Sequence, residues 1–378
     1  MKNVLVIMST NCFYGAEQVL FEYLKNNNGH RFFIYTSDVI KNAIDSISDI
    51  EGVTVVSSSA MRMRSIRRKP MISLFYILRN LFAIHKLVKR NHIDVIYGNN
   101  TVDMVYVMLY RYFFRCSIGT ICHIHDIIQR SMYHKMLRRF GKYIDAFITP
   151  SLAGKNSFID DIDSSDNIHV VYNGCSILRQ RNVRRLEENK AHNKKKMLLF
   201  VGLISELKRV DLFIKIVEKL NKDYPDQYQG VVVGGMSAND SDYISAFESS
   251  LKDSEIRYLG YIKHEQLRSE IFPQVDALVL TSNRDTLPTV ILEAMASNVL
   301  VCARTVDGVP EMIQDGINGV LWDYDASVDM IANIVHVTLH DEGKVTALKE
   351  NALKTIKEKF NPEKKKNLVN ALIDGIST

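Results

Sequence analysis

The feature that most constrains the fold of this chain is an alternation of short apolar runs with segments of helical spacing. In the first half, residues 4–8, 53–57 and 146–149 are among the runs that predict strands, and the intervening patterns predict helices. The alternation restarts at residue 197 and continues to residue 303. Such a pattern is typical of an α/β fold with doubly wound parallel sheets, here two Rossmann-like domains.

A polar segment separates the two halves. Residues 177–196 are basic and contain almost no core-forming residues, so we expect a linker between residues 1–176 and residues 197–350. A chain of 378 residues is also longer than one ordinary core accommodates. Two such domains facing each other imply a cleft, with ligands at the carboxyl ends of the strands. Because no G-x-G-x-x-G signature occurs, an NAD-dependent enzyme is disfavoured.

Residues 281–293 carry the strongest indication of function. An apolar strand runs into a polar loop, and a helix is expected to begin at Pro288 or Thr289, because proline suits the first helical position. Free backbone N–H groups at a helix start form a site for an anion such as a diphosphate. Asp285 and Glu293 flank that site, and carboxylates are suited to accept hydrogen bonds from sugar and ribose hydroxyls. This loop therefore predicts a receptor for a nucleotide-sugar.

Basic residues are concentrated in the first half of the chain. No Asp or Glu occurs from residue 52 to residue 93, and a second basic cluster follows at residues 130–142. Both clusters are interleaved with methionine, aromatic and aliphatic residues, a pattern suited to an anionic membrane surface. We therefore expect residues 61–90 and 130–142 to contact a membrane; the alternative is a solvated helix face over core residues. No recognition module accompanies the charge, so nucleic acid is not an expected partner.

The cysteines bear on the cellular compartment. There are five, they are scattered, and none forms a Cys-x-x-Cys pair. Such a set argues against a disulfide framework or a zinc site and favours a reducing compartment. No uncharged apolar stretch reaches the roughly 18 residues of a transmembrane helix. The expected location is cytoplasmic, with peripheral association with the inner face of the cell membrane.

Several short motifs occur in an order that resembles one enzyme family. The motifs are Tyr14-Gly15-Ala16-Glu17, Ile124-His125-Asp126, Val171-Tyr172-Asn173-Gly174, Phe200-Val201-Gly202 with Lys208, Gly260-Tyr261-Ile262, Asp285 with Glu293-Ala294-Met295-Ala296, and Asp307-Gly308-Val309-Pro310-Glu311. Each alone is weak. Together, in this order and at these spacings, they resemble the motifs of the retaining glycosyltransferases of the GT-B fold, glycosyltransferase family 4. The resemblance covers nearly the whole chain and is strongest over residues 200–322.

The resemblance implies transfer of a sugar from a nucleotide diphosphate-sugar, UDP- or GDP-linked, with retention at the anomeric carbon. It implies that Lys208 neutralises the departing diphosphate, Glu293 binds the ribose and Asp285 binds the donor sugar. His125 would contact the sugar near the reaction centre. Each has a structural alternative: a surface lysine, a helix carboxylate, a loop cap and a hydrogen-bonded core histidine, respectively. The other expected binding residues are Gly15, Gly202, Arg209, Tyr261, Leu287, Pro288, Thr289 and Val290.

No metal or other cofactor is expected. No Asp-x-Asp motif lies at an expected strand end, since Asp161-Ile162-Asp163 falls in a polar loop. Lys208 and helix dipoles would neutralise the charge instead. The resemblance also implies a glycan acceptor and a helix at residues 351–378 that crosses back to the first domain. With the basic first half, it suggests a lipid-linked acceptor and bacterial surface polysaccharide biosynthesis.

Two positions depart from the family pattern. The family usually has glutamate where this chain has Asp285, and it often has arginine directly after the glycine, where this chain has Leu203. These departures leave the base and the sugar of the donor open. Two other functions also stay open. One is a nucleotide-sugar epimerase of the same fold, which would need acid/base carboxylates in the N-terminal cleft, and the other is a non-catalytic partner subunit that binds a nucleotide-sugar.

Overall fold

The computed structural model divides the chain into two compact units. Unit 1 comprises residues 1–173 and 362–378, and unit 2 comprises residues 174–361. The structure describes residues 1–9, 15–27, 29–38, 47–58, 61, 70–177, 195–237, 240–252 and 254–376, with the side chains of residues 70–74 excepted. The expected linker therefore lies mostly outside the described residues, as do Tyr14 and residues 62–69 of the first basic cluster.

Unit 1 is built on a parallel sheet of seven strands in the order β3-β2-β1-β4-β5-β6-β7. The strand order reverses between β1 and β4. Both β2 and β4 pair in parallel with β1, one on each side of it. At such a switch point, the loops that follow the two strands diverge and leave a crevice at their carboxyl ends. The strands are β1 (Asn3–Met8), β2 (Arg31–Ser37), β3 (Val53–Ser58), β4 (Val95–Gly98), β5 (Gly119–His123), β6 (Ala146–Thr149) and β7 (Ile168–Val170).

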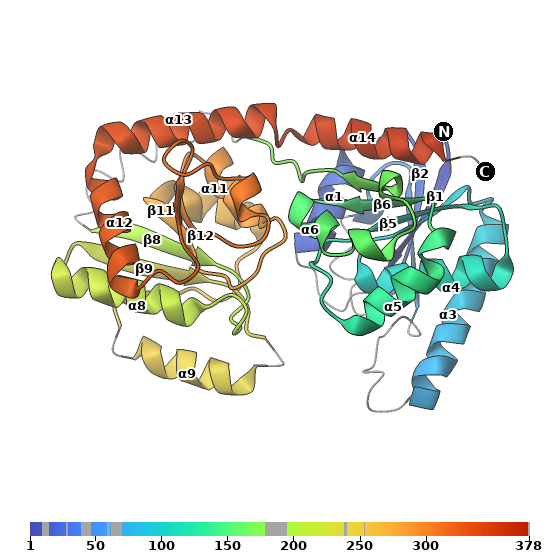
Figure 1. The fold of residues 1–378 in the computed structure, drawn as a ribbon, viewed down its shortest axis with the longest axis horizontal. Helices are drawn as coiled ribbons and strands as arrows, with labels where there is room; N and C mark the ends of the chain where they lie inside the picture. The colour runs from blue at the N-terminus through green and yellow to red at the C-terminus, as the bar shows by residue number, and fades with distance from the viewer. Residues whose placement is uncertain are drawn as a thin grey trace. The chain divides into compact units, whose positions relative to one another are not determined.

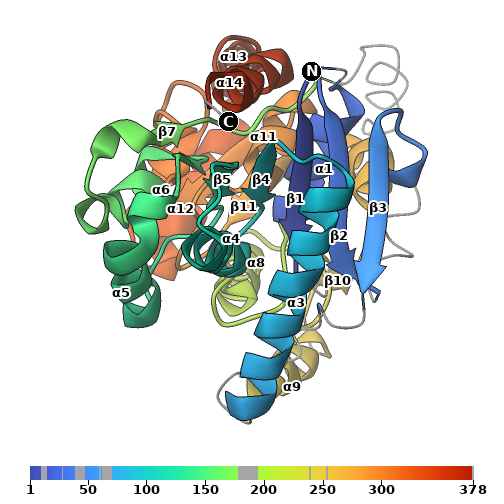
Figure 2. The ribbon, with the colours of Figure 1, turned by 90° about the vertical axis from the view of Figure 1, so that its right-hand side faces the viewer.

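Helices cover both faces of this sheet, because alternate residues of each strand point to opposite faces. In β1, Leu5 and Ile7 belong to one apolar cluster, and Val4 and Val6 belong to the other. Figure 2 shows α3 running along the sheet and projecting beyond it at its N-terminal end. The helices are α1 (Gly15–Lys25), α3 (Pro70–Arg90), α4 (Thr101–Phe114), α5 (Ser131–Phe140), α6 (Leu152–Asn156) and α14 (Pro362–Gly375).

The end of the chain belongs to unit 1 through α14. The hydroxyl of Tyr23 donates to Oδ1 of Asn370 at 2.6 Å, and Val369 and Ile373 are buried in the cluster that covers β1. Lys2 donates to three carbonyls near the end of α14. The expected boundary at residue 351 falls within α13 (Glu342–Glu358) of unit 2, and the division between the units lies at residue 362.

Unit 2 has a parallel sheet of six strands in the order β10-β9-β8-β11-β12-β13. Its strand order reverses between β8 and β11, so a second switch point lies there. The strands are β8 (Lys196–Val201), β9 (Tyr228–Val233), β10 (Ile256–Tyr258), β11 (Ala277–Leu280), β12 (Leu300–Arg304) and β13 (Val320–Trp322). The prediction of two parallel α/β sheets is confirmed, and β7 and β13 are strands that the sequence patterns did not indicate.

The helices of unit 2 also lie on both sides of its sheet. Figure 1 shows α8 and α9 on one side and α11 and α13 on the other. The helices are α8 (Val210–Asp223), α9 (Ser241–Leu251), α10 (His264–Gln266), α11 (Thr289–Ala296), α12 (Val328–His340) and α13 (Glu342–Glu358). The single helix expected at residues 265–272 is instead α10, a π turn at Leu267–Ile271 and a 3-10 turn at Phe272–Gln274. Pro273 lies in the first positions of that 3-10 turn and has no N–H to continue the preceding pattern.

The described helices and cysteines bear on the expected absence of a transmembrane helix and of disulfides. Among the helices that the structure describes, none has the length and the continuous apolar character needed to cross a membrane. The four described cysteines, Cys116, Cys122, Cys175 and Cys302, carry free thiols. Within the described residues there is accordingly no disulfide.

Candidate functional site

The switch point of unit 2 brings together the loops that follow β8 and β11. The hydroxyl of Thr281 donates to the carbonyl oxygen of Arg209 at 2.8 Å, and the N–H of Asn283 donates to the carbonyl of Leu207 at 2.8 Å. These bonds join two segments that are far apart in the sequence. They place Lys208 directly beside Asp285.

Lys208 and Asp285 form an ion pair. Nζ of Lys208 lies 2.6 Å from Oδ2 of Asp285, and the side chains are 27% and 12% exposed, respectively. A charge-assisted hydrogen bond of this length is stronger than one between neutral groups. The candidate phosphate-binding cation and the candidate sugar-binding carboxylate are thus in direct contact.

Asp285 is held in place through its backbone. Its N–H donates to Oδ2 of Asp307 at 2.9 Å, and its carbonyl accepts from the N–H of Gly308 at 3.1 Å. Asp307 itself adopts a positive φ of 37°, a conformation that asparagine and aspartate tolerate better than most residues. The segment after β12 therefore fixes the position of Asp285. A role for Asp307 in positioning Asp285 was not predicted from the sequence.

The helix α11 begins at Thr289, as predicted, with Pro288 in the capping position. No side chain caps this N-terminus, and the proline has no N–H. The first amides of an α-helix have no intrahelical partner, so they are available to an anion. Leu287 and Pro288 are buried, whereas Thr289 and Val290 are partly exposed.

Glu293 lies one turn into α11 and is only 6% exposed. Its Oε1 lies 2.9 Å from Nε2 of His264, the first residue of α10. This contact links α11 to the segment that follows the Gly260-Tyr261-Ile262 motif. His264 is a site residue that sequence reasoning missed, because nothing local to residue 264 indicates a partner in another helix.

The segments that follow β8 and β9 approach each other closely, and this approach requires a glycine at position 234 rather than at the expected position 202. A Cβ on Gly202 would make only ordinary contacts, with Phe200 and with Lys208 at 3.5 and 3.6 Å. A Cβ on Gly234 would lie 1.8 Å from the carbonyl oxygen of Gly202, and Gly234 has a φ of +157°. The close approach therefore depends on Gly234, at the end of β9. The Gly234-Gly235 pair after an apolar run is a signal that could have identified it.

Arg209, which was expected to assist with the phosphates, is engaged within its own loop. It caps α8 in a left-handed conformation, and its guanidinium binds both carboxylate oxygens of Asp211. The pKa of Arg209 is raised, mainly by this hydrogen bond. Both candidate cations are thus engaged by a carboxylate, Arg209 by Asp211 and Lys208 by Asp285.

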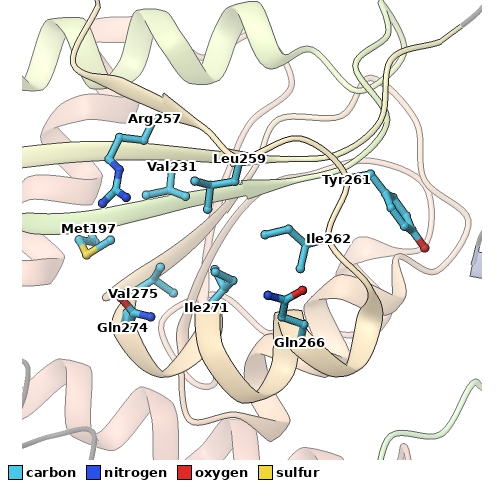
Figure 3. A pocket seen from close by; sticks show the side chains of 10 residues that line it. All are labelled: Met197, Val231, Arg257, Leu259, Tyr261, Ile262, Gln266, Ile271, Gln274 and Val275. Atoms are coloured by element: carbon cyan, nitrogen blue, oxygen red, sulfur yellow. The ribbon is translucent and has the colours of Figure 1, made fainter.

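A cavity of about 460 Å³ lies next to the expected base-contacting loop. Figure 3 shows it between the strands and the helical segment that begins at His264, with Ile262 and Gln266 toward the hollow and Tyr261 apart at one end. Tyr261 is 64% exposed. An exposed aromatic ring beside a hollow is suited to stacking on a planar group.

In unit 1, the expected site residues lie at the carboxyl ends of the strands. Gly15 begins α1, and His125 follows β5. The ring of His125 stacks on that of His123, with 3.9 Å between the centroids, and His123 contacts the hydroxyl of Tyr97 at 2.5 Å. Burial, and secondarily Lys365, lowers the pKa of His125 to about 3, so its imidazole is neutral at physiological pH.

Comparisons with known proteins agree with this geometry. Residues 183–355 match the family model described as glycosyl transferases group 1, and residues 15–177 match the model described as glycosyltransferase family 4. The structure of HepE from Anabaena, solved with UDP and glucose, is similar to this chain with a TM-score of 0.80 and 17% sequence identity. The superposition covers 99% of this chain and 100% of the HepE chain. The chain belongs to the GT-B glycosyltransferases of the family 4-like type.

Other relatives match only part of the chain. A 41.2 kDa protein from the cps region of Klebsiella pneumoniae is 26% identical over 56% of this chain and 57% of its own. A D-inositol 3-phosphate glycosyltransferase of Corynebacterium kroppenstedtii is 27% identical over 55% of this chain and 48% of its own. The chain thus spans about half the length of these relatives. An N-acetylgalactosaminyltransferase of Campylobacter jejuni is 20% identical over 74% of both chains.

Two buried ionisable residues of unit 1 were not predicted from the sequence. Asp103, at the start of α4, has no exposed surface; its Oδ1 accepts from the backbone N–H and the hydroxyl of Ser9, after β1. Burial raises the pKa of this carboxyl to about 7. Lys365 of α14 donates weakly to Asn173 and Val19, and burial lowers its pKa to about 7. Charged residue types in helical segments give no sign of such burial in the sequence.

In the described part of the chain, no three His, Cys, Asp or Glu side chains lie together as metal ligands. Asp161 instead pairs with His134 and Arg138. Metal independence stays a prediction.

Proposed function

We propose that this glycosyltransferase moves a sugar from a UDP- or GDP-linked donor to a lipid-linked glycan acceptor, with retention at the anomeric carbon. The observation that carries the proposal is the Lys208–Asp285 pair beside the uncapped N-terminus of α11, with Glu293 one turn further along. In this reaction the bond from the anomeric carbon to the diphosphate breaks. A bond from that carbon to the acceptor oxygen forms, and the acceptor proton passes to the leaving diphosphate.

Each group at the switch point of unit 2 has a distinct role in this proposal. Lys208 and the first amides of α11 stabilise the charge that develops on the diphosphate. Asp285 accepts hydrogen bonds from the donor sugar, and Glu293 accepts them from the ribose. Tyr261 and Ile262, at the cavity beside the ribose site, contact the base. In this proposal Lys208 and the amides of α11 supply the positive charge, and no metal ion is needed.

Unit 1 would supply His125. Its Nε2 is buried and has no hydrogen-bond partner among the described residues. A neutral imidazole can donate to or accept from a hydroxyl, so His125 is suited to orient a sugar hydroxyl. It is not suited to act as a cation, because its pKa is lowered to about 3.

The comparisons support the donor and acceptor classes. HepE has been solved with UDP and with UDP-glucose. The Campylobacter relative acts on a saccharide linked to undecaprenol through a diphosphate, and the Klebsiella relative is encoded in a cps region. A lipid-linked acceptor in surface polysaccharide assembly is consistent with these relatives.

One exposed face of α3 supports docking on an anionic membrane. Phe75 and Phe82 are 62% and 65% exposed, and Leu78 between them is 41% exposed. They lie on one face, since residues spaced by three or four share a helix face. Lys86 and Lys89 continue this face toward the C-terminal end and are exposed. Exposed aromatic rings beside cations are typical of interfacial helices at the cytoplasmic leaflet.

Thermal-shift binding tests the proposal. The purified protein is melted in EDTA with UDP-, GDP-, CMP- and TDP-sugars, and the Glu293→Gln variant is melted alongside. We expect one nucleotide class to stabilise the wild type and not the variant, without added metal. Stabilisation by no member of the panel, or equal stabilisation of the variant, would contradict the donor site. Isomerisation of the donor without any acceptor would favour an epimerase instead.

A further inference from the structure

Both carboxylates of the proposed donor site already have a basic partner within the chain. Asp285 pairs with Lys208, and Glu293 pairs with His264. A diphosphate that uses Lys208 must therefore compete with Asp285 for the same ammonium group. The outcome of this competition depends on what else the ligand offers to Asp285.

The two partners differ in mobility. Asp285 is tied by its N–H to Asp307 and by its carbonyl to Gly308, and its side chain is only 12% exposed. Lys208 is more exposed and carries its charge on a flexible four-carbon stem. On ligand binding, the ammonium group of Lys208 can turn toward a phosphate, while the carboxylate of Asp285 stays in place.

A sugar-linked diphosphate and a free nucleoside diphosphate present different groups to that carboxylate. The sugar carries hydroxyls, which donate hydrogen bonds to Asp285 and replace the contact with Lys208. The free diphosphate has no sugar, and its terminal phosphate gains a second ionisation with a pKa near 6. Asp285 would then lose its cation and face additional negative charge. Two like charges a few ångströms apart repel strongly at a partly buried site.

We propose that Asp285 makes the donor site select the intact nucleotide-sugar over the free nucleoside diphosphate, by competing with the terminal phosphate for Lys208. This inference rests on the proposed function, in which the diphosphate is the leaving group. Once the sugar has been transferred, Asp285 recaptures Lys208 and weakens the hold on the diphosphate. The ion pair thereby favours release of the product.

Titration calorimetry in EDTA tests this inference with UDP, GDP and their glucose and mannose derivatives. The variant is Asp285→Asn, which removes the charge and keeps the shape. We expect it to bind the free nucleoside diphosphate about ten-fold tighter than the wild type, a change of about 1.4 kcal/mol. It should bind the nucleotide-sugar no tighter than the wild type. Asp285→Ala serves as a second neutral variant, and thermal melts establish that each variant is folded.

Two further variants separate the ion pair from other causes. Asp285→Glu keeps the negative charge and should show no gain for the free diphosphate. The double variant Lys208→Gln/Asp285→Asn should lose the gain, because the freed ammonium group is its source. A gain that persists in the double variant would show that the new amide binds the phosphate by itself, and would overturn the inference.

The experiment also distinguishes this inference from the proposed function. If the wild type binds neither the nucleoside diphosphates nor their sugars, the proposed donor site is overturned. If the wild type binds them and Asp285→Asn binds the free diphosphate no tighter, only the role of Asp285 in selectivity is overturned.

Discussion

The buried carboxyl of Asp103 allows a quantitative prediction for the substitution Asp103→Asn. The side chain has no exposed surface, and Oδ1 accepts two hydrogen bonds from Ser9. Asparagine has the same shape and keeps an oxygen for those bonds, but it cannot ionise. The substitution therefore removes the cost of a buried charge and preserves the packing between β1 and α4.

The magnitude follows from the pKa of this carboxyl. Burial raises the pKa from 3.8 to about 7 in the folded protein. Because the unfolded chain loses this proton first, wild-type stability falls as the pH rises from the unfolded pKa to the folded one. From about pH 5 to about pH 8, the loss amounts to about 3 kcal/mol, at about 1.4 kcal/mol per pKa unit. The Asp103→Asn variant should not show this loss.

Calorimetric melts at about pH 5 and about pH 8 measure the effect. For a unit of this size, about 3 kcal/mol corresponds to a Tm difference of roughly 6–12 °C. We expect the Tm advantage of Asp103→Asn over wild type to grow by that amount between the two pH values. Asp160→Asn, at an exposed position of the same unit, is the control and should behave as wild type. If wild type and Asp103→Asn respond equally to pH, Asp103 titrates alike in the folded and unfolded states and the reasoning is refuted.

Other substitutions test other parts of the structure. Burial lowers the pKa of Lys365 to about 7. Lys365→Met should therefore stabilise unit 1 more at pH 7 than at about pH 10, where the unfolded lysine begins to lose its proton as well. Urea titration at both pH values checks this, and equal gains would contradict it. Gly234→Ala should destabilise unit 2 by about 1–3 kcal/mol or more, because its Cβ would overlap a backbone carbonyl, whereas Gly235→Ala, which meets nothing within 4 Å, should cost little. Phe82→Ser should reduce flotation with anionic vesicles without lowering Tm. Val337→Ser, at another exposed apolar position in unit 2, should leave flotation unchanged. Unchanged flotation of Phe82→Ser would contradict the contact of α3 with the membrane.

Local patterns were sufficient for most of the elements. The apolar runs at residues 4–8 and 277–280 are strands, and α11 begins where the proline and threonine predicted. Such features depend on neighbouring residues alone. The expected helix at residues 265–272 was partly wrong, because the chain there contains a π turn and a proline-led 3-10 turn. A helical spacing of apolar residues does not distinguish these turns from a regular α-helix.

The candidate site was only partly predictable for a different reason. Asp285 and Glu293 could be identified together, since they share one loop and one helix. The pairing of Asp285 with Lys208 and of Glu293 with His264 could not be predicted, because the order of strands in the sheet brings these partners to them.

The sequence by itself determined the α/β class, the two sheets and the loop that ends in α11, because hydrophobic periodicity and turn residues act over a few positions. The tertiary structure decided which charges meet. It paired Lys208 with Asp285 across 77 positions of sequence, and it buried Asp103 with no cation beside it among the described residues. These outcomes depend on strand order and on helices packed from distant segments. The carboxyl of Asp103 would have an ordinary pKa on an isolated helix, where water would surround it.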